Sequence, residues 1–191
     1  KNGNRVEVNA RRFVSVDDTA VGAICYTVKP LNFSGEIVVQ PYLDGDVFNE
    51  DSNYNEKFWV EISKDINGSE GVLITETLKT KFRVGAAMNF RVLKNGNPEN
   101  AEIITSAAEK FVQAEQKVLV KSGDEVCVEK YVAVISSLDF KEDLLAAKAV
   151  EIAKQAKNSG FEFLFKNHKN LWLKKWETSD IKIEGDVAAQ Q

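Results

Sequence analysis

Between about residues 5 and 139 the chain consists of short runs in which apolar and polar residues alternate. The alternation is clearest at positions 24–28, 37–41 and 126–134. A period of two is typical of β-strands, because successive side chains of a strand point to opposite faces of the sheet. The runs predict roughly eight to ten strands, and the small number of long apolar runs favours antiparallel sheets over a buried parallel sheet.

Dipeptides that favour tight turns separate several of these runs. Asn67-Gly68 and Asn95-Gly96 favour type I′ turns, whose central residues need positive φ, and Asp44-Gly45 follows Leu43 in the same way. Each dipeptide therefore predicts a hairpin. Strands of this kind bury one face of each sheet most simply in a sandwich. We predict a mostly β fold, an antiparallel β-sandwich that forms part of a larger sandwich, with one or two C-terminal helices.

After Asp139 the hydrophobic period becomes helical. Asp139 and Glu142 form a capping-box pattern at the start of a first helix, and Gly160 is a natural stop for it. One face of this helix carries Leu145, Ala149, Ile152 and Ala156. A second helical face carries Phe161, Phe165, His168, Trp172 and Trp176. We expect a sandwich over residues 1–138 and a helical segment over residues 139–179 that packs on it.

Composition narrows the classes of partner. The chain has 191 residues and a formal net charge of −4, with a sequence pI near 5.2. These values fit one soluble domain and provide no basic surface for nucleic acid or an anionic membrane. No apolar run approaches the ~20 residues that span a bilayer, so we expect no nucleic-acid and no membrane partner. Cys25 and Cys127 follow no spacing rule, which favours two buried free thiols over a disulfide.

Residues with catalytic or ligand-binding chemistry are sparse. A metal site needs clustered ligands, and one histidine with two distant cysteines does not supply them. A Ser-His-Asp triad would need His168, whose position among Phe and Trp residues favours a structural, hydrogen-bonded imidazole. Glycine-rich phosphate loops are missing, and Asp44 is better explained as a turn former. We assign no catalytic, cofactor-binding or metal-binding residue.

The tryptophans are the candidate interaction residues. Trp172 and Trp176 are four positions apart and form one stripe on a helix, which favours a core or an interdomain interface. Trp59 lies between Phe58 and Val60 in an expected strand, where burial is also favoured. The alternative for Trp172, Trp176 and Trp59 is stacking on sugar rings, since exposed aromatic rings can contact a ligand through their faces.

Several motifs together resemble glycoside hydrolase family 65, the family of maltose, trehalose, kojibiose and nigerose phosphorylases and related α-glucoside hydrolases. They are RFVS (12–15), ICYTVKPLNFSGEI (24–37), LDGDVFN (43–49) and WLKKWETSDIKIEGDVAAQQ (172–191). In order and spacing they are similar to pieces of that family's N-terminal domain, whereas residues 51–100 match it loosely. The tail resembles the junction with the family's catalytic helical barrel, so residues 180–191 are expected to begin a linker to that barrel.

Two departures from the family pattern limit what the resemblance implies. The family's domain usually starts earlier, with a Ser-Leu-Gly-Asn-Gly segment and further strands, so the chain resembles the later part of the sandwich. We expect the natural protein to start before Lys1 and to continue past Gln191. The barrel carries the family's general acid and phosphate-binding residues, and no position here matches those motifs. The resemblance therefore implies a non-catalytic part of a parent enzyme.

The resemblance also implies the chemistry of that parent. It would cleave α-linked glucose disaccharides with inversion, by phosphorolysis or hydrolysis, with inorganic phosphate as co-substrate of a phosphorylase and no cofactor. Its implied partners are the catalytic barrel of the same chain, a second copy in a homodimer and the α-glucoside disaccharide. A phosphorylase favours a cytoplasmic location, and the periplasm or secretion stays open. The alternative is a free-standing carbohydrate-binding β-sandwich module.

Overall fold

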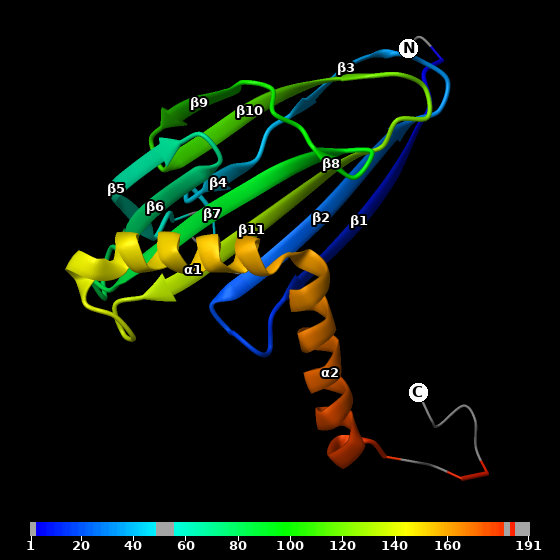
Figure 1. The fold of residues 1–191 in the computed structure, drawn as a ribbon. Helices are drawn as coiled ribbons and strands as arrows, with labels where there is room; N and C mark the ends of the chain where they lie inside the picture. The colour runs from blue at the N-terminus through cyan, green and yellow to red at the C-terminus, as the bar shows by residue number, and fades with distance from the viewer. Residues whose placement is uncertain (1–2, 49–55, 182–183, 186–191) are drawn as a thin grey trace.

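The structure is a computed structural model that describes residues 3–48, 56–181 and 184–185. Within these residues the chain forms two antiparallel sheets and two α-helices (Figure 1). The strands are β1 (Val6–Val14), β2 (Val21–Pro30), β3 (Gly35–Val39), β4 (Tyr42–Asp44), β5 (Trp59–Asn67), β6 (Glu70–Thr77), β7 (Arg83–Lys94), β8 (Asn97–Pro98), β9 (Ile103–Ala108), β10 (Phe111–Val120) and β11 (Val126–Ser136). The helices are a 3₁₀ turn (Glu142–Leu144), α1 (Leu145–Ser159) and α2 (Phe161–Ser179). The predicted antiparallel sandwich with C-terminal helices is confirmed.

The larger sheet runs in the order β1-β2-β11-β7-β6-β5, with β8 paired to β7. The smaller sheet has β10 in its centre, β9 on one side, and β3 and β4 on the other. Pro41 separates β3 from β4, because proline has no N–H to donate to the neighbouring strand. The carbonyl of Pro41 still accepts a hydrogen bond from the amide of Ala114 in β10 (2.9 Å).

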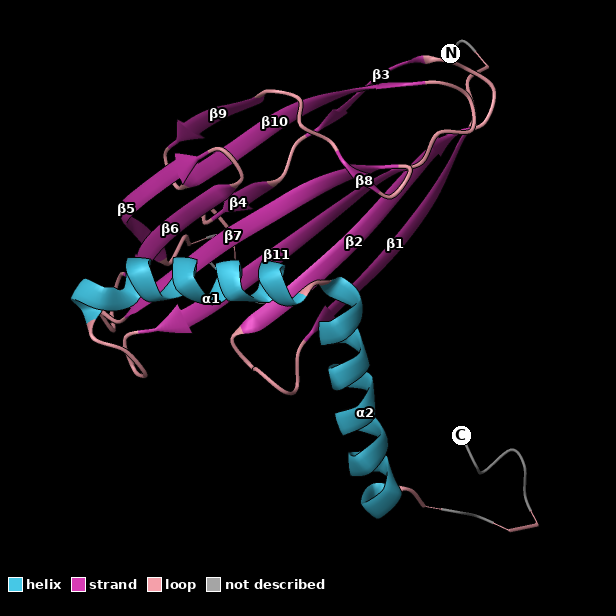
Figure 2. Cartoon of the chain, viewed as in Figure 1, coloured by secondary structure: helices cyan, strands magenta, loops and turns pink. Residues whose placement is uncertain are grey.

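Two apolar layers hold the domain together. Between the sheets, strands of the larger sheet contribute Phe90, Val92 and Val126, and the smaller sheet contributes Val118 and its neighbours. On the other face of the larger sheet lies α1, which crosses its central strands (Figure 2). Strand β7 has buried residues on both faces, which explains the apolar run from Val84 to Met88.

Helix α1 approaches the sheet closely where small residues face each other. Ala149 and Ala153 are fully buried against β6, β7 and β11. A Cβ on Gly85 would meet the side chain of Ile74 at 3.1 Å and the main chain of α1 at 3.5 Å. Leu145, Ala149 and Ala156 are buried as predicted, Ile152 is partly buried, and Ala153 was not in the predicted face.

Three local predictions need correction. Asp139 and Glu142 form no capping box: α1 has Leu144 at its N-cap with no side-chain cap, and Asp139 accepts from the hydroxyl of Ser136 at 3.0 Å. Asp44-Gly45 makes no hairpin, because β4 belongs to the smaller sheet and the next described strand, β5, to the larger one. Asn67-Gly68 does sit in a hairpin, but Asn67 pairs with Glu70, so the loop is Gly68-Ser69.

Other boundaries agree with the sequence. Asn95-Gly96 joins β7 to β8 with φ of 50° and 79°, the backbone that a type I′ turn requires. Gly160 ends α1 with a φ of 82°, and its amide donates to the carbonyl of Ala156 at 3.1 Å. Most of the expected linker, at positions 182–183 and 186–191, lies outside the described residues.

Candidate functional site

Helix α2 carries a continuous row of aromatic rings along one face. The ring centroids of successive members lie 6.0 Å (Phe161–Phe165), 6.5 Å (Phe165–His168), 6.4 Å (His168–Trp172) and 6.4 Å (Trp172–Trp176) apart. The predicted common helical face is therefore confirmed. We call these five residues the aromatic row.

The first half of the aromatic row fixes α2 to the sandwich. Phe161 is 1% exposed and packs with Val21, Ala23 and Tyr131. Phe13 of β1 meets Phe161 edge-on, with centroids 5.5 Å apart, and also contacts the rings of Phe165 and His168.

Arg11 of β1 strengthens this attachment. Its guanidinium lies over the ring of Phe161, 4.8 Å from the centroid, and forms an ion pair with Glu162 in the first turn of α2. The hydrogen bond to Glu162 raises the pKa of Arg11 above its usual value. Since both partners are largely exposed, the pair orients the helix more than it stabilises it.

The C-terminal half of α2, which carries the second half of the aromatic row, projects away from the sandwich (Figure 1). Every described residue from Trp172 to Ile181 is exposed. Trp172 and Trp176 stack on each other while remaining 41% and 57% exposed, and Leu173 beside them is 53% exposed. Contiguous exposed apolar side chains of this kind make the end of α2 a candidate interaction surface.

His168 lies where the buried half meets the exposed half. Its ring is 4.9 Å from that of Phe13, and its Nδ1 is buried without a hydrogen-bond partner in the described residues. The prediction of a fully hydrogen-bonded imidazole is therefore wrong for this nitrogen. A buried polar atom without a partner is costly, so this nitrogen is a position for a hydrogen bond with water or with a group outside the described residues.

A buried polar network supports the junction between the helices. Glu129 accepts from Nε of Arg91 at 2.7 Å and from the hydroxyl of Tyr131, and both Glu129 and Tyr131 are buried. Beside them, the ammonium of Lys157 in α1 donates to Asn89 at 2.8 Å. Burial raises the pKa of Tyr131 and lowers that of Lys157. This network was missed from the sequence, because its members come from two strands, β7 and β11, and from helix α1.

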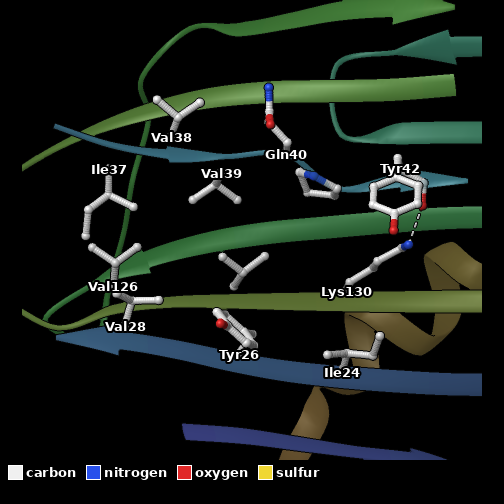
Figure 3. A pocket seen from close by; sticks show the side chains of 12 residues that line it. Ile24, Tyr26, Val28, Ile37, Val38, Val39, Gln40, Tyr42, Val126 and Lys130 are labelled. Carbon is white, nitrogen blue, oxygen red and sulfur yellow. Dashed lines mark hydrogen bonds between the residues drawn. The ribbon is translucent and has the colours of Figure 1, made fainter. Parts of the chain in front are cut away.

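A second apolar surface is the groove between the two sheets, where β3 and β4 face β2 and β11 (Figure 3). It encloses about 640 Å³. One side of the groove comes from β2 and β11, and the opposite side comes from β3 and β4. The lining residues are Ile24, Tyr26, Val28, Ile37, Val38, Val39, Gln40, Pro41, Tyr42, Val126, Val128 and Lys130. The β1–β2 register places Val8 and Ala10 on this same face, opposite Val28 and Tyr26.

Lys130 is the one cation among the residues that line this groove. Its ammonium donates to the backbone carbonyl of Tyr42 and lies 5.5 Å from the centre of the Tyr42 ring. Burial lowers the pKa of Lys130 to about 8, because an apolar surrounding disfavours the charged form.

Trp59 is separate from the other two tryptophans. It opens β5, at the opposite edge of the larger sheet from β1, and its ring meets Phe82 edge-on with centroids 6.4 Å apart. It is half-buried and lines a small cavity of about 180 Å³ together with Leu43 and Leu73. The structure therefore brings Trp172 and Trp176 together but does not bring Trp59 to them.

Other kinds of site find little support in the described part of the chain. In residues 3–48, 56–181 and 184–185, no three His, Cys, Asp or Glu side chains group as a metal site requires. No helix in those ranges has the length and apolar character to cross a membrane.

The architecture thus defines a β-sandwich domain with an aromatic helical arm. The sequence matches the N-terminal domain model of glycosyl hydrolase family 65 over residues 1–175. The chain belongs to this family of N-terminal domains.

Curated relatives agree with this assignment. The chain is 31% identical over 186 residues to a maltose phosphorylase of Bacillus subtilis, covering 97% of the chain and 24% of the relative. It is 31% identical over 197 residues to an α,α-trehalose phosphorylase of Thermoanaerobacter brockii, covering 99% and 25%. A kojibiose phosphorylase of Halothermothrix orenii is 27% identical over 193 residues, covering 96% and 24%. The chain thus spans about a quarter of their length.

A solved structure shares the fold. A candidate kojibiose phosphorylase from the human microbiome superposes with a TM-score of 0.84 at 18% identity, covering 100% of this chain and 24% of that one.

Proposed function

We propose that the chain is the non-catalytic N-terminal domain of a family 65 enzyme and that the catalytic domain packs against its aromatic row. The parent would cleave α-linked glucose disaccharides with inversion, by phosphorolysis with inorganic phosphate or by hydrolysis. The observation that carries the proposal is the stacked, exposed pair Trp172 and Trp176 on the helix that ends the domain.

Two further observations support a protein partner on this helix. The buried Nδ1 of His168 has no hydrogen-bond partner in the described residues, and a group docked beside the exposed indoles could provide one. The relatives are about four times as long as the matched region, so most of each relative lies outside the domain. Aromatic residues at the centre of an interface supply most of its binding energy.

The first test uses the chain as it stands. Maltose, trehalose and kojibiose, each with and without inorganic phosphate, should be neither cleaved nor bound. Hydrolysis of a glycoside needs two positioned carboxyl groups, and the resemblance to family 65 implies that the general acid and the phosphate-binding residues of a phosphorylase lie in the barrel. Turnover above the buffer blank after rigorous purification would refute the non-catalytic role. Saturable quenching of tryptophan fluorescence by a disaccharide would favour the carbohydrate-binding module instead.

The second test addresses the aromatic row. A hybrid would join this chain to the remaining three quarters of the Bacillus subtilis maltose phosphorylase. Replacing Trp172 and Trp176 by lysine should abolish its maltose phosphorolysis. Leu119→Lys is the matched control, because Leu119 is 71% exposed on the smaller sheet, away from α2. Equal activity of the two variants would refute docking through the indoles.

A homodimer is also part of the proposal. In the described residues no strand pairs with the outer edge of β1. Val6, Val8 and Val14 of this strand are 50%, 48% and 70% exposed. An open strand edge with apolar side chains favours pairing with another strand, and a second copy provides one.

A further inference from the structure

Cys25 and Cys127 meet on the outer face of the larger sheet, although they are 102 positions apart in the chain. The pairing of β2 with β11 places Cys25 opposite Glu129 and Cys127 opposite Thr27. The two thiols are therefore diagonal neighbours on one strand pair. Their Sγ atoms lie 3.2 Å apart, and neither cysteine is in a disulfide. The sequence predicted two free buried thiols but did not predict this contact.

We propose that Cys25 and Cys127 form a modification site at which a disulfide oxidant closes an intramolecular bond between β2 and β11. A disulfide has an S–S distance of about 2.0 Å, so the sulfur atoms need to approach by a further ~1.2 Å. Rotation of the two side chains can supply part of that approach. Diagonal neighbours have Cα atoms about 7–8 Å apart, which exceeds the ~4.4–6.8 Å usual for a disulfide, so the two strands also have to move towards each other.

The two thiols differ in their surroundings. Cys25 lines an open depression of about 270 Å³ together with Asn9, Arg11 and Thr27, although the residue itself is only 7% exposed. Cys127 is intermediate in exposure, and burial together with the neighbouring Cys25 raises the pKa of its thiol to about 12. A raised pKa disfavours the thiolate that attacks a disulfide, so the proposal gives the first step to Cys25.

The reaction then proceeds in two exchange steps. The sulfur of Cys25 loses its proton and attacks a disulfide such as oxidised glutathione, which forms a mixed disulfide and releases one molecule of the thiol. Cys127 loses its proton and displaces the second molecule of thiol, forming the Cys25–Cys127 bond. The chain loses two protons and two electrons, and the oxidant gains them as two thiols.

The position of the bond connects it to α2. Cys25 belongs to the same buried cluster as Tyr131 and Phe161, with Cys127 packed against it. A covalent link there would tie β2 to β11 directly beneath the first turn of the helix that carries the aromatic row. The proposal does not depend on the function proposed above, since it concerns the folded domain alone.

The experiment uses the full chain, reduced, freed of reductant and kept folded, with oxidised glutathione as the probe. The free thiol count should fall from two to none, and the mass should decrease by about 2 Da, the two hydrogen atoms lost. A peptide map should join the segment containing Cys25 to the segment containing Cys127. Added dithiothreitol should restore both thiols.

The single variants Cys25→Ser and Cys127→Ser are the matched controls. Neither should show the decrease in mass under the same conditions, because an intramolecular bond needs both sulfur atoms. Three outcomes for the unaltered chain would overturn the proposal: two thiols that persist, a stable glutathione adduct on Cys25, or a disulfide-linked dimer in place of the internal bond. These results do not require the variants to fold.

Discussion

Replacing Phe161 by alanine tests whether the attachment of α2 contributes to the stability of the whole domain. Phe161 is 1% exposed and lies in a cluster with Val21, Ala23 and Tyr131, the strand residues beneath the helix junction. Its ring also pairs with those of Phe13 and Phe165. Truncation would leave a cavity that main-chain atoms of two strands and two helices cannot easily fill.

The expected loss in the free energy of unfolding is about 4 kcal/mol, because burial of Phe in a core is worth ~3–5 kcal/mol relative to Ala. An aromatic pair contributes ~0.5–1.5 kcal/mol of that beyond area alone. The half-exposed Arg11 over the ring adds about 0.5 kcal/mol. For a chain of this length 1 kcal/mol shifts Tm by ~2–4 °C, so we expect Tm to fall by about 8–16 °C.

Urea unfolding followed by far-UV circular dichroism measures this loss, with calorimetry for Tm. Phe163→Ala is the matched control: the same substitution two positions along α2, where the ring is 56% exposed, should change stability by no more than about 0.5 kcal/mol. A Phe161→Ala variant within 1 kcal/mol of the unaltered chain, or two variants of equal stability, would show that α2 is not anchored through Phe161.

Two further predictions concern the inter-sheet groove and the open edge of β1. Because the pKa of Lys130 is lowered to about 8, the unfolded chain, with an ordinary lysine near 10.4, binds more protons between these values. The unfolding free energy of the unaltered chain should therefore rise with pH through that window relative to Lys130→Met. Urea unfolding of both at pH 7 and pH 10 measures this, and parallel profiles would contradict it. Separately, light scattering over a concentration series should show self-association through β1, and a strictly monomeric chain at high concentration would argue against an open edge.

The hydrophobic period and the turn-forming dipeptides predicted the strands and helices, because both properties depend on residues that are close together in the sequence. Alternation identified β2 and β11, and the four-three-four-four spacing from Phe161 to Trp176 identified the aromatic row. The Asn95-Gly96 turn followed from its backbone requirement alone. The same reasoning failed at Asp139. Its carboxylate accepts a hydrogen bond from the hydroxyl of Ser136 and not from an amide at the start of the helix.

Features that depend on strand pairing could not be read from the chain. The contact of Cys25 with Cys127, the Glu129 network and the apolar groove around Lys130 each join strands that are distant in sequence. Their members become neighbours only through the β2–β11–β7 order and its register. A shift of one residue would move every one of these side chains to the other face. Register, more than composition, therefore determines these sites.

The comparisons also show that this fold tolerates extensive sequence change. The chain is 31% identical both to a maltose phosphorylase and to an α,α-trehalose phosphorylase, although these names specify different disaccharides. The fold persists at 18% identity with a TM-score of 0.84, as expected where pattern and packing are retained while individual residues change.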